Sequence, residues 1–159
     1  MDKKRSAFFD GIKYDDLIFV CSTIVGMARK VKQTETYVIN KMDKKGIQLE
    51  LDTASVNHCG DPDVYYTELI NDYELEVGSY DVTESLDEQT KLPDERYMGS
   101  IYARLIVDVY EVRNGKILDI MMEVFRSEFP LCVNDYQMAW YFTQSNIIVQ
   151  EYLKGEFSE

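Results

Sequence analysis

Apolar side chains recur at intervals of three and four residues near the start of the chain, which is the period of an α-helix. They share one helical face and comprise Leu17, Val20, Cys21, Ile24, Ala28 and Val31. Asp15 or Asp16 precedes them, and a short carboxylate there accepts hydrogen bonds from free backbone N–H groups. The pattern predicts an N-terminal helix over residues 16–32.

Further along the chain the period changes to two, which is typical of half-buried β-strands. Residues 34–41 are rich in β-branched and aromatic side chains, and apolar and polar residues alternate over 47–52. Residues 43–46, Asp-Lys-Lys-Gly, supply turn chemistry between these two stretches. We therefore predict a β-hairpin over 34–51, and a single strand over 73–77, where the alternation returns.

Asn114 and Gly115 give the clearest local signal, because both tolerate the positive φ angles that a tight type I′ hairpin turn requires. A two-residue turn here pairs residues 104–112 with residues 117–125. In that register one face of the pair is apolar apart from Glu111, which lies next to the turn. The turn and the pattern choose the same register, so we predict a long hairpin.

Two further helices are indicated by their end signals. Asp61 followed by Pro62 is typical of a helix entry, with Asp as the cap and Pro at the first helical position. Asn134 begins a capping-box pattern before a periodic apolar stretch, and Gly155 stands where a C-terminal cap belongs. These signals predict a short helix after Pro62 and a long one over 135–154.

Together the elements predict an α+β fold. Two hairpins and one strand would form an antiparallel sheet of about five strands, packed on one side by the N-terminal and C-terminal helices. We expect residues 1–14 to be a basic aromatic arm, and residues 15–159 to be a single domain. Residues 83–97 have few apolar side chains and include Pro93, so they are expected to be an extended loop.

Charge is concentrated in one part of the chain. Residues 51–95 contain thirteen acidic side chains and one base, Lys91, so this segment carries −12, equal to the formal charge of the whole protein. Residues 1–50 carry +3 and residues 96–159 carry −3. This balance disfavours direct binding to a nucleic-acid backbone and permits binding to a basic partner. The acidic segment fits either an interface or a solvated face that keeps the protein soluble.

Composition indicates a globular protein in a reducing compartment. The chain has 159 residues and 45% hydrophobic content. Its twelve tyrosines fit a binding surface, and half-buried positions on an exposed sheet explain them equally. The three cysteines are far apart and odd in number, which favours reduced thiols over a disulfide framework. We expect no signal peptide and no membrane span, since the longest apolar run is Leu17 to Cys21, and we place the protein in the cytoplasm or in a virion.

Candidate chemistry is sparse. His58 is the only histidine and stands beside Cys59, but adjacent side chains usually point apart and so do not form a ready-made nucleophile–base pair. Zinc would need His58 and three distant cysteines to converge, and a hard cation could use Asp61, Asp63 and Glu68, although a helix cap explains Asp61 equally. We predict no metal, no cofactor and no catalytic residues.

Three hypotheses for function follow. The first is a non-enzymatic assembly subunit acting through protein–protein contacts, such as a ring or connector of a viral particle, as a homo-oligomer within a larger hetero-assembly. The second is an acidic inhibitor or decoy of a basic, nucleic-acid-binding protein. The third is an enzyme with an unrecognised site near His58. Under the first hypothesis the interface candidates are Lys3, Lys4, Arg5, Phe8, Phe9, Asp87, Glu88, Asp94 and Glu95.

Overall fold

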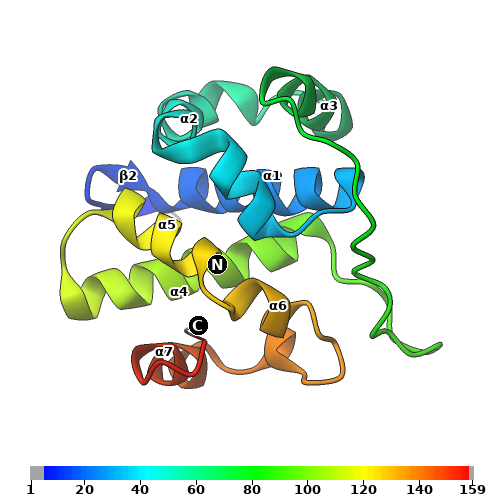
Figure 1. Cartoon of the computed structure of the whole chain (residues 1–159). Coiled ribbons are helices and arrows are strands. Elements are labelled where there is room, and N and C mark those ends of the chain that lie inside the picture. The colour runs from blue at the N-terminus through cyan, green and yellow to red at the C-terminus, as the bar shows by residue number, and fades with distance from the viewer. Residues whose placement is uncertain (1–5, 158–159) are drawn as a thin grey trace.

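Helices build most of the molecule (Figure 1). The structure, a computed structural model, describes residues 6–157, and in that range it contains one two-stranded sheet, in which β1 (Phe8–Phe9) pairs antiparallel with β2 (Ile12–Lys13). The helices are α1 (Tyr14–Val31), α2 (Glu35–Asn57), α3 (Pro62–Asp72), α4 (Glu95–Arg113), α5 (Ile117–Arg126), α6 (Phe129–Val133), the short 3₁₀ helix η2 (Trp140–Phe142) and α7 (Ser145–Leu153). The predicted α+β fold with a five-stranded sheet is therefore wrong.

Helix α1 crosses the middle of the molecule, with α2 and α3 on one side and α4 on the other (Figure 1). The predicted N-terminal helix is thus confirmed. The helices around α1 bury even its polar residues Ser22 and Thr23. The hydroxyls of these two residues donate to the carbonyls of Ile18 and Phe19 at 2.7 and 2.9 Å. Gly99 of α4 lies directly against the backbone of Ser22, so α1 and α4 approach closely at this crossing.

The predicted hairpin over 34–51 is wrong, because these residues form the first part of α2. The Thr34 hydroxyl caps that helix by accepting a hydrogen bond from the Tyr37 amide at 3.1 Å. The buried residues recur at helical intervals, and burial against α1 and α5 outweighs the preference of β-branched residues for strands. The turn chemistry appears instead as a kink at Asp43, where φ is +61°.

The predicted long hairpin is also wrong, although its turn prediction is half correct. Asn114 and Gly115 have φ angles of +60° and +96°, but they connect helix α4 to helix α5. Buried residues of the two helices follow the helical period: Met98, Tyr102, Leu105, Ile106 and Val109 in α4, and Ile117, Ile120, Met121, Val124 and Phe125 in α5. The alternation over 104–112 is part of a wide buried helical face that begins upstream at Met98.

The two other predicted helices have different outcomes. Asp61 caps α3 by accepting from the Asp63 amide at 2.9 Å, as predicted. The long helix over 135–154 is interrupted at Ala139, where φ is +61°, and the short 3₁₀ helix η2 and α7 form in its place. Asn134 does not start a helix: it is the C-cap of α6, and its side chain is buried against Glu35 of α2.

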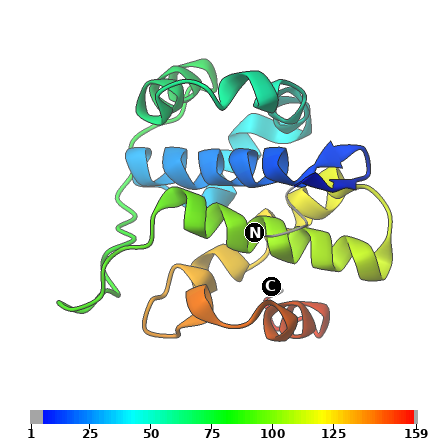
Figure 2. The ribbon, with the colours of Figure 1, turned by 180° about the vertical axis from the view of Figure 1, so that it is seen from behind.

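Residues 74–94 form neither helix nor strand, so the strand predicted over 73–77 is wrong. We call residues 74–94 the acidic strap. The strap descends along the molecule from α3 past the end of α1, and its outermost part projects beyond the helical body (Figures 1 and 2). It ends where α4 begins, so the extended loop expected over 83–97 stops at Asp94.

The N-terminal hairpin is attached to the helical body. The Phe9 ring packs edge-on against Tyr14 and Tyr110, with centroid separations of 6.0 and 6.4 Å. The Asp10 carboxylate accepts a hydrogen bond from the amide of Ile117 at 3.0 Å, at the start of α5.

Within residues 6–157, none of the helices has the length and apolar character needed to span a membrane.

Candidate functional site

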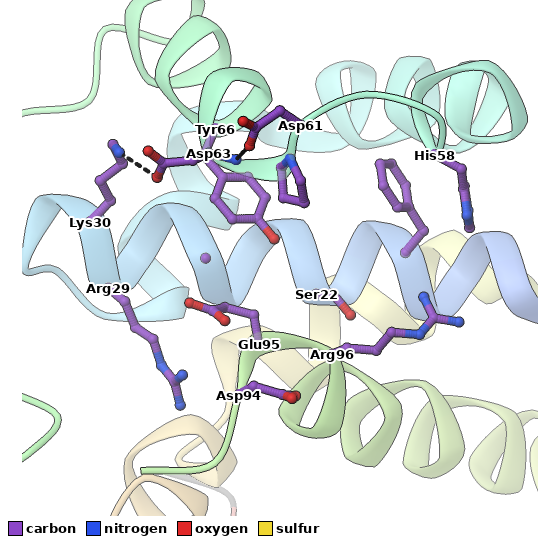
Figure 3. Close-up of a pocket in the computed structure, with 13 residues that line it drawn as sticks. Ser22, Arg29, Lys30, His58, Asp61, Asp63, Tyr66, Asp94, Glu95 and Arg96 are labelled. Carbon is purple, nitrogen blue, oxygen red and sulfur yellow. Dashed lines mark hydrogen bonds and ion pairs between the residues drawn. The ribbon is translucent and has the colours of Figure 1, made fainter.

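A groove of about 770 Å³ opens between α1, the start of α3 and the start of α4 (Figure 3). Its lining contains both charge signs and aromatic rings: Phe19, Ser22, Gly26, Arg29, Lys30, His58, Asp61, Pro62, Asp63, Tyr66, Asp94, Glu95 and Arg96. Three segments that are far apart in sequence supply these side chains. The groove is therefore a product of the helix packing and not of any single motif.

His58 lies at one end of the groove and is held by an aromatic neighbour. Its ring stacks on Phe19 with centroids 4.2 Å apart. The Nδ1 atom lies 3.9 Å from an Asp15 carboxylate oxygen, and the Nε2 atom lies 3.6 Å from an Asp16 oxygen. Nε2 is buried and makes no hydrogen bond to any described residue. Cys59, the neighbour of His58, is solvent-exposed.

The charged groups of the groove are largely committed to one another. Lys30 pairs with Asp63 at 2.7 Å, and Arg96 pairs with Asp15 at 2.8 Å. The Ser22 hydroxyl donates to a backbone carbonyl of its own helix. Among the lining residues no hydrogen bond joins a nucleophile to a base, which nucleophilic catalysis would require.

The metal-binding residue sets considered from the sequence do not come together. Within residues 6–157, no group of three or more His, Cys, Asp or Glu side chains is placed to hold a metal ion. Cys21 is buried in the core, where burial raises the pKa of its thiol, whereas Cys59 is exposed. Asp61 acts as the cap of α3, and the Asp63 carboxylate pairs with a lysine.

The acidic strap is the second candidate surface. It carries seven acids and one base, a net charge of −6, and every one of these acids is solvent-exposed: Glu74, Glu76, Asp81, Glu84, Asp87, Glu88 and Asp94. Hydrogen bonds from Thr83 lower the pKa of Asp81, and bonds from Thr90 and Gln89 lower the pKa of Asp87.

Backbone hydrogen bonds attach the first part of the strap to the end of α1. The amides of Gly78 and Tyr80 donate to the carbonyls of Val31 and Lys32 at 2.7 and 2.9 Å. Leu75 packs in the hydrophobic core and anchors the strap by apolar contact, and Val82 is buried. The first part of the strap, which carries Glu74, Glu76 and Asp81, is thus fixed to the helical body.

A buried polar cluster lies beneath the strap. Glu35, at the start of α2, has no solvent exposure, and the Asn134 side-chain amide donates to both of its oxygens at 2.8 and 3.1 Å. Burial raises the pKa of Glu35 to about 7, against the opposing effects of Asn134 and of the nearby Arg29 charge. Arg29 donates to the Pro93 carbonyl at 2.7 Å and to the Tyr136 hydroxyl at 3.3 Å.

The interface candidates predicted from the sequence lie in different places. Phe8 is 67% exposed, whereas Phe9 is packed on the body. Asp87 and Glu88 are exposed on the strap, Asp94 caps α4, and Glu95 lines the groove from the first turn of α4. Lys3, Lys4 and Arg5 lie outside the described residues.

Sequence reasoning missed Arg29, Glu35 and Asn134 as a group. Glu35 and Asn134 stand 99 positions apart, and each looks like an ordinary helix-end residue in its own segment. Only the packing of α2 against the segment after α6 brings them together. No local pattern in the sequence could have shown this cluster.

Comparisons with protein-family models, with curated proteins and with solved structures find no match for this chain.

Proposed function

We propose that this protein is a non-enzymatic subunit that acts through protein–protein contacts within a larger assembly, with the acidic strap as its main contact surface. The observation that carries the proposal is the display of seven exposed carboxylates on a segment that is anchored to the helical body. A fixed segment loses little conformational freedom on binding, so more of the electrostatic attraction is available as affinity.

The partner of such a surface is basic. The first fifty residues carry +3, so another copy of the chain could supply the basic surface in a homo-oligomer within a hetero-assembly. A ring or connector of a viral particle is one form of this proposal, with the cytoplasm or the virion as the place of action. Phe8, exposed on the N-terminal hairpin, adds an aromatic contact of the kind that anchors interfaces.

A second candidate is an acidic inhibitor that occupies the basic site of a nucleic-acid-binding protein. The strap favours it, because a row of surface carboxylates on an extended segment offers successive negative charges to a basic cleft. The two candidates differ in stoichiometry: an assembly subunit forms defined higher-order particles, and an inhibitor forms a complex with one basic protein.

Native mass spectrometry of the protein isolated with its bound partners tests both candidates. Glu84→Gln with Glu88→Gln removes two strap charges, and Glu68→Gln with Asp72→Asn removes two exposed charges from α3 as a matched control. We expect the strap variant to weaken the complex by about two- to thirty-fold, since each exposed ion pair contributes about 0.2–1 kcal/mol, and the α3 variant to behave as wild type.

Two outcomes would contradict the proposal. One is equal weakening by both variants, which would mean that only net charge matters. The other is full function of the strap variant in cells together with loss of function in His58→Ala, which would favour an enzyme acting at the groove.

A further inference from the structure

The acidic strap is tied to the body through the buried cluster around Glu35. Asn134 donates to Glu35 with its side chain and accepts a hydrogen bond from the Ser85 hydroxyl of the strap with its backbone carbonyl, at 3.2 Å. The same Ser85 hydroxyl accepts from the Tyr136 amide at 2.9 Å. The middle of the strap is therefore fastened to the residue that binds the Glu35 carboxyl group.

The far end of the strap is fastened through the same cluster. The Arg29 guanidinium donates to the carbonyl of Pro93 in the strap and to the hydroxyl of Tyr136. Its positive charge also acts on Glu35, where it lowers the carboxyl pKa. Arg29 thus connects the end of the strap, the segment after α6 and the buried acid.

Every element packed around Glu35 contributes a named group. Arg29 comes from α1, Tyr102 from α4, Tyr80 from the strap and Tyr136 from the segment after α6. Arg29 is the one charged side chain among these four, and the buried hydroxyl of Tyr102 lowers the pKa of Glu35 by hydrogen bonding. One arginine and neutral groups therefore surround a carboxyl group that is fully removed from water.

We propose that Glu35 is a proton-operated latch for the acidic strap: closing the strap buries the Glu35 carboxyl group, and loss of the carboxyl proton favours the open strap. Opening lifts Tyr80 and Ser85 away from Asn134 and lets water reach the carboxylate. The claim that the latch regulates partner binding rests on the proposed function. The opening of the strap can be measured on this protein without any partner.

The sign of the pH dependence follows from linkage. Burial in the closed state raises the Glu35 pKa from its usual 4.5 to about 7, so the closed state binds the proton more tightly than the open state. The closed strap is favoured most at low pH, and the ratio of open to closed forms rises as the pH passes from 4.5 through 7. Between pH 5.5 and pH 8 this ratio should rise about thirty-fold and then level off.

Hydrogen exchange followed by NMR on the full chain, without any partner, tests the latch. The Gly78 and Tyr80 amides report on the strap, because both are hydrogen-bonded to the end of α1. Their protection factors, corrected for intrinsic exchange, should fall about thirty-fold from pH 5.5 to pH 8. Core amides of α1 and α4 should change much less. Strap protection that is independent of pH, or that falls in step with the core, would overturn the latch.

Two variants sharpen the result. Glu35→Gln keeps an acceptor for Asn134 but cannot ionise, so the strap should lose its pH dependence. Glu50→Gln changes a second buried acid of the described chain, which accepts hydrogen bonds from Tyr65 and Tyr73 and none from Asn134. This variant should keep the wild-type curve. Unchanged pH dependence in Glu35→Gln would overturn the latch, and if that variant does not fold, the wild-type curves alone decide. Failure of partner binding leaves these measurements unaffected.

Discussion

Replacement of Gly99 by alanine should disturb the closest contact between α1 and α4. A Cβ atom at Gly99 would lie 2.6 Å from the backbone nitrogen of Ser22 and 2.7 Å from its Cα atom. Carbon atoms in contact normally lie about 3.5–4.0 Å apart, so the two helices would have to separate by about 1 Å. A side chain can rotate away from such a clash, but a helix backbone cannot.

The expected cost follows from two opposing effects. Overpacking of a well-packed interior costs about 1–3 kcal/mol and more where backbones collide, and here the clash is with backbone atoms. Alanine recovers about 1 kcal/mol, because it favours the helical conformation more than glycine does. With the upper end of that cost, the free energy of unfolding of Gly99→Ala should therefore fall by about 2 kcal/mol. The Tm should fall by about 4–8 °C for a chain of this size.

Thermal and urea unfolding followed by circular dichroism measure this effect. Gly60→Ala is the matched control, because a Cβ atom at Gly60 meets nothing within 4 Å, and this variant should unfold at or slightly above the wild-type temperature. A Tm for Gly99→Ala equal to that of Gly60→Ala would refute the close crossing of α1 and α4.

Two further substitutions test how the N-terminal hairpin is attached to the body. Asp10→Ala should destabilise the protein by about 1–2 kcal/mol, because it removes the hydrogen bond to the Ile117 amide and places alanine at φ +53°. Asp10→Asn should recover most of this loss. Equal unfolding curves for the two variants would refute the cap. Phe9→Ala should lower the free energy of unfolding by about 1–3 kcal/mol and Phe8→Ala by less than about 0.5 kcal/mol, since Phe9 packs on the body and Phe8 is exposed. The reverse order in chemical denaturation would contradict this packing.

The helices that could be predicted are those whose own segment carries an end signal or apolar side chains at helical spacing. Helix α1 has apolar side chains at helical spacing, and α3 has an Asp-Pro entry, so both were found. The positive φ angles of Asn114 and Gly115 were also found, but turn chemistry does not determine which elements a turn connects. The same residues that close a hairpin can end a helix.

The wrong strand assignments share one physical cause. Segments such as residues 104–112 place apolar side chains on a broad helical face, and a broad face produces short runs of apparent alternation. β-branched residues then favour the strand interpretation, although helix packing in the core decides otherwise. The groove and the Glu35 cluster depend on contacts between distant segments, so local patterns do not contain them.

Site-specific photo-cross-linking in the native cell tests the central claim that the acidic strap is the contact surface. A photoreactive residue is placed at Gln89, which is exposed on the strap, and in parallel at Gln48, which is exposed on α2. We expect Gln89 to give a discrete cross-linked product with a basic protein or a second copy of this chain, weakened by Glu84→Gln with Glu88→Gln. Products from Gln48 alone, or Gln89 products that the charge changes leave untouched, would contradict the claim.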